Sequence, residues 1–254
     1  MKNDKLWQFL VVFTIISVLV VNYLSTAIPF GGQTNATVSD KYHTFFTPAG
    51  YAFSIWGLIY LGLLAFAFYQ ATPAQRNNPR FRTIRQWVVI NGVLNCIWLP
   101  LFQNELFSAS VAVILGMLFT LLMITEGLQI NKKPVPATET WLSRIPFSIY
   151  FGWVTVATIA NAAVWLKATG FEGVGLEEPT WSVVMIIIGL FVGAFVFNRY
   201  RNVAYILVFT WAYTAIAVEQ ADAYYVQLIA GACAVGAVVL AIAGVISRKT
   251  PAYT

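Results

Sequence analysis

Residues 46–70 contain no charged residue and are about as long as a helix must be to cross a bilayer. Pro48 lies near the beginning of this stretch, and we expect it in the first turn of the helix, where its fixed φ and missing N–H are tolerated. Phe53, Trp56 and Tyr60 recur at helical spacing and therefore share one face. Trp56 and Tyr60 carry polar tips, which need a partner inside the protein or in a ligand.

The chain repeats such apolar runs along its whole length. Only 10% of its residues are charged and 59% are hydrophobic, whereas soluble domains carry about 25% charged residues. The sequence therefore predicts an all-α integral membrane protein of about eight transmembrane helices, with seven as the alternative because the seventh run is short. The first run exceeds the length typical of a signal peptide, so we expect a retained span rather than a cleaved signal. The eight runs are residues 6–28, 46–70, 87–102, 106–128, 142–166, 180–197, 203–218 and 224–246.

Basic residues mark one side of this topology. With the N-terminus in the cytoplasm, every lysine and arginine except Lys41 and Lys167 falls in or beside a cytoplasmic segment. Such charge is retained on the cytoplasmic side during insertion, so we expect both termini there. Omitting one span would move Arg199 and Arg201, or Arg248 and Lys249, to the outside. The outer links collect acidic residues, namely Asp40, Glu105, Glu172, Glu177, Glu178, Glu219 and Asp222.

Several function classes are disfavoured by what the chain contains. The net charge of +5 is explained by topology, and the basic residues do not cluster as a nucleic-acid footprint would require. Cys96, Cys233 and His43 are not spaced as metal ligands, and the sequence predicts no metal and no cofactor. No paired carboxylates, nucleophile with a base, or phosphate loop is present, so we do not expect an enzyme. Glu126 lies near the end of a span, where it either reaches the interface or takes part in function.

Two spans carry polar and aromatic side chains on one face. In residues 87–102 the face consists of Asn91, Asn95, Trp98 and Phe102, and in residues 142–166 it consists of Trp153, Ala157, Asn161 and Trp165. A buried amide without a partner is costly in lipid, so the asparagines should point into the bundle. Periodicity alone leaves two interpretations, interhelical hydrogen bonding or a ligand pocket.

Three motifs resemble those of the TspO/MBR family, the translocator or tryptophan-rich sensory proteins. The first runs from Thr47-Pro48 through Trp56 and Tyr60, and the second is Asn95-Cys96-Ile97-Trp98-Leu99-Pro100-Leu101-Phe102. The third is Trp153 followed by Asn161 and then Trp165. The resemblance implies a five-helix bundle over residues 1–166, whose internal pocket takes porphyrins and, in some members, sterols or synthetic ligands. By the same resemblance, residues 29–47 would cap the pocket.

The matching positions name the expected ligand contacts. They are Trp56, Tyr60, Asn95, Trp98, Trp153 and Asn161. Two features depart from the family. Pro146 precedes Trp153 by seven residues rather than four, and residues 167–254 add a C-terminal extension of about three spans.

The leading functional hypothesis is a membrane receptor, sensor or transporter for a flat amphipathic ligand such as a tetrapyrrole, a sterol or an isoprenoid. The alternatives are a secondary transporter of a small solute or ion that uses the extra spans, a porphyrin-degrading membrane enzyme, and a purely structural role. The expected partners are the lipid bilayer and the hydrophobic ligand, with a homodimer left open. Because no transit-type N-terminus is evident, we expect the plasma membrane of a bacterium.

Overall fold

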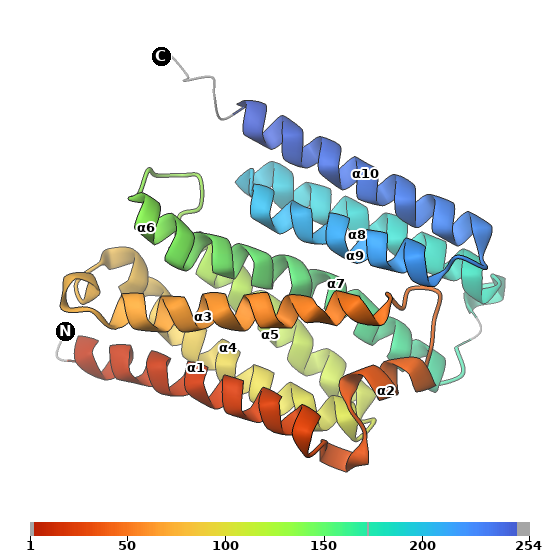
Figure 1. The fold of residues 1–254 in the computed structure, drawn as a ribbon, viewed down its shortest axis with the longest axis horizontal. Helices are drawn as coiled ribbons and strands as arrows, with labels where there is room; N and C mark the ends of the chain where they lie inside the picture. The colour runs from red at the N-terminus through yellow and green to blue at the C-terminus, as the bar shows by residue number, and fades with distance from the viewer. Residues whose placement is uncertain (1–2, 172, 248–254) are drawn as a thin grey trace.

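The computed structural model describes residues 3–171 and 173–247. Lys2, Glu172, Arg248 and Lys249, which belong to the charge pattern above, lie outside the described residues. The described chain is helical, with no β-strand in these two ranges, and confirms the all-α prediction (Figure 1).

In the described residues, eight long helices alternate in direction along the chain (Figure 1). They are α1 (Asp4–Ala27), α3 (Ile55–Ala71), α4 (Pro79–Gln103), α5 (Phe107–Gly127), α7 (Ile145–Ala168), α8 (Glu178–Tyr200), α9 (Val203–Glu219) and α10 (Tyr224–Ser247). Short elements lie in the links: η1 (Phe30–Gly32), α2 (Asn35–Lys41), η2 (Gly50–Ser54), η3 (Pro73–Gln75), α6 (Ala137–Glu139), the π-helical turn η4 (Thr140–Arg144) and η5 (Gly173–Gly175).

Six of these helical stretches are long and apolar enough to cross a membrane. They contain α1, α3, α5, α7, α8 and α10. Of the other two, α4 carries three arginines and several amides, and α9 has 17 residues. A multi-helix membrane protein is therefore supported in the described ranges, and the count of eight spans stays a prediction.

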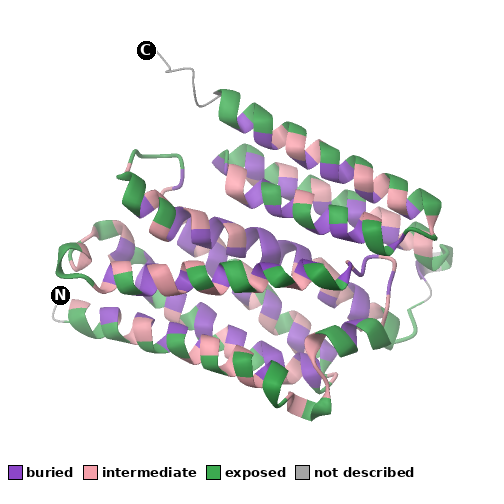
Figure 2. Cartoon of the chain, viewed as in Figure 1, coloured by how far each residue is buried: buried purple, intermediate pink, exposed green. Residues whose placement is uncertain are grey.

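Helix α7 lies at the centre of the fold. Within its membrane-length stretch 56% of the residues are buried, against 28% for α1 and for α10 (Figure 2). Helices α1, α3, α4 and α5 lie on one side of α7, and α8, α9 and α10 form a layer on the other, with α10 outermost (Figure 1). A Cβ at Gly152 of α7 would lie 2.7 Å from the Tyr205 carbonyl oxygen, so this glycine permits close contact with α9.

Two element boundaries differ from the sequence prediction. Pro48 is not in a helix, because the chain there is bound to α9: the Ala49 N–H donates to the Ala215 carbonyl over 3.1 Å. Helix α4 begins at Pro79, well before residue 87, since Asn78 caps it and proline suits its first position.

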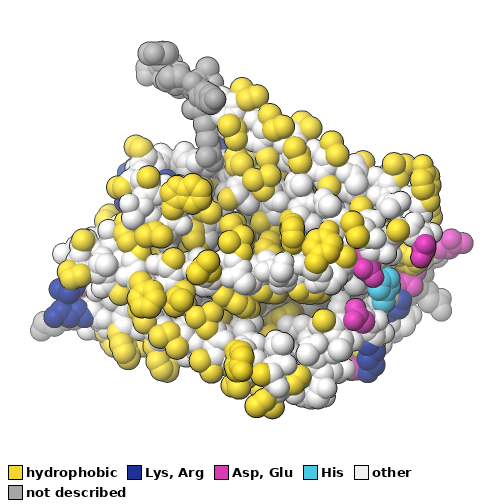
Figure 3. All heavy atoms as spheres, in the orientation of Figure 1, with side chains coloured by type: hydrophobic (Ala, Val, Ile, Leu, Met, Phe, Trp, Pro, Cys, Tyr) yellow, Lys and Arg dark blue, Asp and Glu magenta, His cyan; other side chains and the backbone are white. Residues whose placement is uncertain are grey.

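Charge is distributed along the long axis of the bundle. Helix α1 begins and α10 ends at the same end of the bundle (Figure 1), and basic side chains gather at that end (Figure 3). Most of the visible acidic side chains lie at the opposite end (Figure 3). This is the asymmetry on which the predicted topology rests, and it defines a basic end and an acidic end.

Candidate functional site

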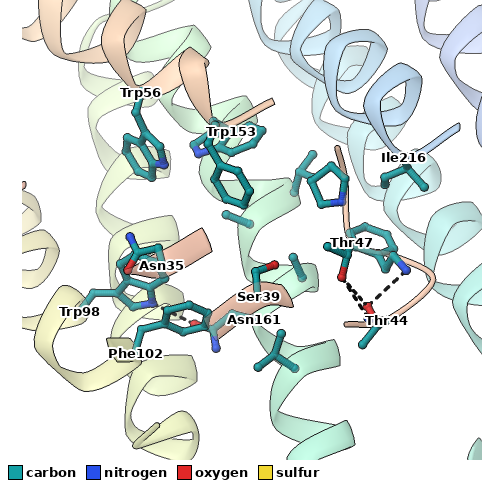
Figure 4. Close-up of a pocket in the computed structure, with 17 residues that line it drawn as sticks. Asn35, Ser39, Thr44, Thr47, Trp56, Trp98, Phe102, Trp153, Asn161 and Ile216 are labelled. Atoms are coloured by element: carbon teal, nitrogen blue, oxygen red, sulfur yellow. Dashed lines mark hydrogen bonds between the residues drawn. The ribbon is translucent and has the colours of Figure 1, made fainter. Parts of the chain in front are cut away.

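A small apolar cavity lies near the acidic end of the bundle, between α3, α4 and α7 (Figure 4). Its volume is about 60 Å³. Residues of α2 and of the segment before η2 also line it, and we call residues 29–47 the cover. That this cover caps a ligand pocket, as the resemblance implied, stays a prediction. Its walls carry the indole rings of Trp56, Trp98 and Trp153 together with Phe53 and Phe102.

Four of the six predicted contact residues line this cavity: Trp56, Trp98, Trp153 and Asn161. The Trp56 and Trp153 rings meet edge to face, with centroids 6.2 Å apart. Trp98 stacks on Phe102 one turn away, at 5.0 Å between centroids. Residues from three helices, far apart in sequence, are thereby brought to one place.

Tyr60 and Asn95 do not line the cavity but belong to a hydrogen-bonded network beside it. Asn22 of α1 donates to Asn95 Oδ1 over 2.9 Å and accepts from the Tyr60 hydroxyl. Asn95 in turn donates to the Tyr150 hydroxyl over 3.1 Å. These bonds join α1, α3, α4 and α7, as expected if the amides serve interhelical hydrogen bonding. Contact of Tyr60 and Asn95 with a ligand stays a prediction.

The amides on α4 and α7 are largely satisfied within the protein. Asn161 Oδ1 accepts from Trp98 Nε1 over 2.8 Å, and its amide donates to Ser110 Oγ over 2.9 Å. Asn91 donates to Thr120 Oγ1 and to the Met117 carbonyl of α5. These contacts fix how α4, α5 and α7 pack around the cavity.

Among the described residues that line the cavity, Trp153 is the one with a fully buried side-chain polar atom that has no hydrogen-bond partner. Its side chain is 3% exposed, and its Nε1 atom is buried with no hydrogen-bond partner among the described residues. An unsatisfied buried donor costs about 1–3 kcal/mol. An acceptor atom on a bound molecule would remove this cost.

The cover over the cavity is held by the turn between α4 and α5. Glu105 accepts hydrogen bonds from Lys41, from the Tyr42 hydroxyl at 2.6 Å and from Gln33 at 2.7 Å. These donors, Lys41 first, hold the pKa of Glu105 down at about 2. Gln103 adds a bond from the Phe30 N–H at 2.9 Å. Sequence analysis assigned Glu105 to an outer link but did not identify it as an anchor.

The C-terminal extension also reaches the cavity. Ile216 of α9 lines it, and Gln220 donates to the Thr47 carbonyl over 3.1 Å. Trp211 Nε1 donates to the Ala52 carbonyl over 3.1 Å. Helix α9 therefore forms part of the wall and positions the segment before α3. The division into residues 1–166 and 167–254 stays a prediction.

A second hollow of about 400 Å³ lies between α1 and α3. It shares Asn35, Phe53 and Trp56 with the cavity, and Tyr60 and Asn22 line it. The two spaces therefore lie next to each other, with these three residues in the wall of both.

Glu126 lies away from both hollows, near the basic end. Its carboxylate accepts from Lys132 and from the Tyr200 hydroxyl. The carboxylate is paired with Lys132, and its position relative to the membrane interface stays a prediction. In the described part of the chain no three His, Cys, Asp or Glu residues come together as a metal site would require.

Comparison with known proteins gives one family match. The family model described as "TSPO-like protein" matches residues 8–246. The matched range includes α8, α9 and most of α10, so the C-terminal extension lies within the family's pattern. No curated protein and no solved structure matches the chain.

Proposed function

Because the chain belongs to the TSPO-like protein family, as its three motifs predicted, we propose that it binds a flat, amphipathic ligand of the tetrapyrrole type. The ligand binds in the aromatic cavity of the bundle, for sensing or transport rather than for turnover. Trp56, Trp98 and Trp153 supply ring faces and apolar area, as is usual in such sites.

The unpartnered Nε1 of Trp153 is the observation that carries this proposal. The cavity otherwise presents apolar surface, and the amide of Asn161 is already bound to Trp98 and Ser110. A ligand carboxylate or carbonyl oxygen placed near Trp153 would satisfy the one buried donor that the protein leaves open there. The ligand class is therefore a large apolar body with a hydrogen-bond acceptor at its edge.

The closed cavity is too small for such a ligand. Its volume of about 60 Å³ compares with roughly 300–1,000 Å³ for sites that take drug-sized molecules. The neighbouring hollow of about 400 Å³ supplies the missing space once Phe53 and Trp56 move aside. In the proposed bound state the ligand occupies both spaces, and Tyr60, which lines the hollow, contacts it there.

The orientation of the protein in the membrane is part of the same proposal. The basic end faces the cytoplasm of a bacterial cell, with both termini on that side, because positive charge is retained there during insertion. Helices α8–α10 complete the wall through Ile216 and hold the cover through Gln220.

Titration of the purified protein in detergent with protoporphyrin IX, followed by quenching of tryptophan fluorescence, tests the proposal. We expect saturable quenching at micromolar ligand, weakened in Trp153→Phe. Trp141→Phe is the matched control, because Trp141 is 67% exposed and is absent from the cavity wall. Linear quenching that is the same in all three proteins would mean partition into detergent and would reject the site.

A further inference from the structure

Two buried arginines at the basic end each bind backbone carbonyls of an interhelical link, but only one of them has a carboxylate oxygen of a described residue within 4 Å. Arg85 and Arg144 are 1% and 7% exposed. Arg85 donates to the carbonyls of Gln75 and Arg76, in the link that leads to α4. Arg144 donates to those of Leu128, Gln129 and Lys133, in the link that leads to α7. Each guanidinium thus organises the link before its own helix.

Of these two arginines, only Arg85 has a carboxylate oxygen from the described part of the chain within 4 Å of its guanidinium. Asp4 Oδ1 lies 3.6 Å from the Arg85 guanidinium. Arg144 has no carboxylate oxygen within 4 Å among the described residues. The acid just before it, Glu139, is bound by Arg80 through two hydrogen bonds. Glu139 therefore acts on Arg144 only from beyond 4 Å, and within the described chain the buried Arg144 guanidinium lacks the direct contact with an anion that a buried charge normally has.

Arg144 lines a recess of about 730 Å³ at the basic end. The link after α5 forms one wall, and the first turns of α7 and α9 form the others. Helix α9 has 17 residues and spans about 26 Å, and its first residues, Val203 and Ala204, line the recess.

Further donors converge on the same recess. Lys133 lines it, is exposed, and forms no ion pair among the described residues, whereas Lys132 is taken up by Glu126. The first turn of α9 contributes Val203 and Ala204, whose N–H groups have no intrahelical acceptor. Helix N-termini and basic side chains both favour an anion, and phosphate above all.

The recess is also partly apolar. Ile130, Val135, Ile145 and Leu207 line it, and Leu207 of α9 is 45% exposed one turn beyond Val203. Basic pockets between transmembrane helices at a membrane surface are sites for anionic lipid headgroups. We propose that this recess binds the phosphate of an anionic phospholipid, which serves as the counter-ion of Arg144, with an acyl chain along Leu207.

Native mass spectrometry of the purified full-length protein in detergent tests the proposal. Phosphatidylglycerol and phosphatidylcholine with identical acyl chains are titrated separately. We expect one phosphatidylglycerol to be retained preferentially. Lys133→Gln should weaken its binding about fivefold, the factor expected for one basic contact with an anionic surface. Lys5→Gln, a change of an exposed lysine at the same end but outside the recess, should leave it unchanged.

A second variant supplies the missing anion from within the protein. Ala204→Glu places a carboxylate in the first turn of α9, where an acid is compatible with the helix. It should abolish the preference for phosphatidylglycerol, whereas Ala204→Gln, of similar size and neutral, should retain it. If circular dichroism shows that Ala204→Glu is not folded, the result for Lys133→Gln alone decides whether the proposal holds.

Three results would overturn the proposal. One is equal retention of the two lipids, and another is unchanged binding of phosphatidylglycerol by Lys133→Gln. The third is displacement of the lipid by inorganic phosphate or glycerol phosphate at comparable concentration, which would assign the recess to a free phosphate. Because no tetrapyrrole is present in these assays, the outcome is independent of the proposed function.

Discussion

Trp98 Nε1 donates to Asn161 Oδ1 over 2.8 Å, so the indole of α4 is fixed to the amide of α7 at the wall of the cavity. Both residues are buried, and Asn161 also bonds to Ser110 of α5. One amide thus joins three helices. The same bond leaves Trp153, on α7, as the indole at the cavity whose buried N–H has no partner in the described chain.

Replacement of Asn161 by alanine should therefore reduce stability. The Trp98 N–H and the Ser110 hydroxyl each lose a partner in a buried environment, and such a loss costs about 1–3 kcal/mol. The free energy of unfolding, measured by titration with sodium dodecyl sulfate in mixed micelles, should fall by this amount. Asn104→Ala, at an exposed residue that bonds within its own turn, should change it by less than about 0.5 kcal/mol. Equal effects of the two changes would contradict this role of Asn161.

Trp153→Phe and Trp98→Phe should differ in the same assay. Trp153→Phe removes a donor that has no partner, so its cost is limited to the lost ring volume and offset by removal of the unsatisfied N–H. Trp98→Phe breaks the bond to Asn161 and should cost more. Ligand binding should show the reverse order, with Trp153→Phe the weaker binder. If Trp98→Phe has the larger effect on both stability and ligand binding, Trp153 does not make the proposed contact with the ligand.

Some of this arrangement could be predicted from the sequence. The spacing of Trp98 on one span and of Trp153 and Asn161 on another put them on inward faces, because helical periodicity is a local property. Contacts between helices that are distant in the sequence could not be predicted from it. Asn22 is one of two amides in the apolar run of residues 6–28, with Gln8, and nothing in its spacing points to Asn95 and Tyr60. The contribution of Ile216 depends on α9 packing against α7, which the order of the helices does not determine.

The ion pair between Glu105 and Lys41 should hold the cover in place over a defined pH range. The pKa of Glu105 is lowered from 4.5 to about 2, chiefly by the bond from Lys41. A lowered acid pKa means that the stabilising contribution is complete above about pH 4.5 and is lost as the pH falls toward 2. Deuterium uptake by residues 33–42 should rise across this window once corrected for the intrinsic exchange rate.

Glu105→Gln should raise deuterium uptake by residues 33–42 already at pH 7. Asp40→Asn, at an exposed acid of the same cover for which no bond to the α4–α5 turn is found, serves as the control. Equal uptake by Glu105→Gln and the unchanged protein would show that the cover is held by its other contacts.

Gly152→Ala should loosen the contact between α7 and α9. Its Cβ would lie 2.7 Å from the Tyr205 carbonyl oxygen and 2.9 Å from Val208 Cβ, so the two helices must separate. Overpacking of this kind costs about 1–3 kcal/mol. Gly57→Ala, where no atom lies within 4 Å, should be neutral or stabilising by up to about 1 kcal/mol. The free energy of unfolding is measured for both variants. Equal changes in the two variants would contradict the close packing at Gly152.

Filling the cavity tests the central claim most directly. Ala160 lines the cavity together with Trp153 and Asn161, and Ala160→Leu should fill part of the cavity without removing an aromatic ring. Ala232→Leu, on the exposed face of α10, adds the same side chain elsewhere. The dissociation constant for protoporphyrin IX is measured by equilibrium titration of each protein in detergent. We expect binding to weaken at least about tenfold, or 1.4 kcal/mol, in Ala160→Leu alone. Equal affinity of the two variants and the unchanged protein would contradict a ligand site in this cavity.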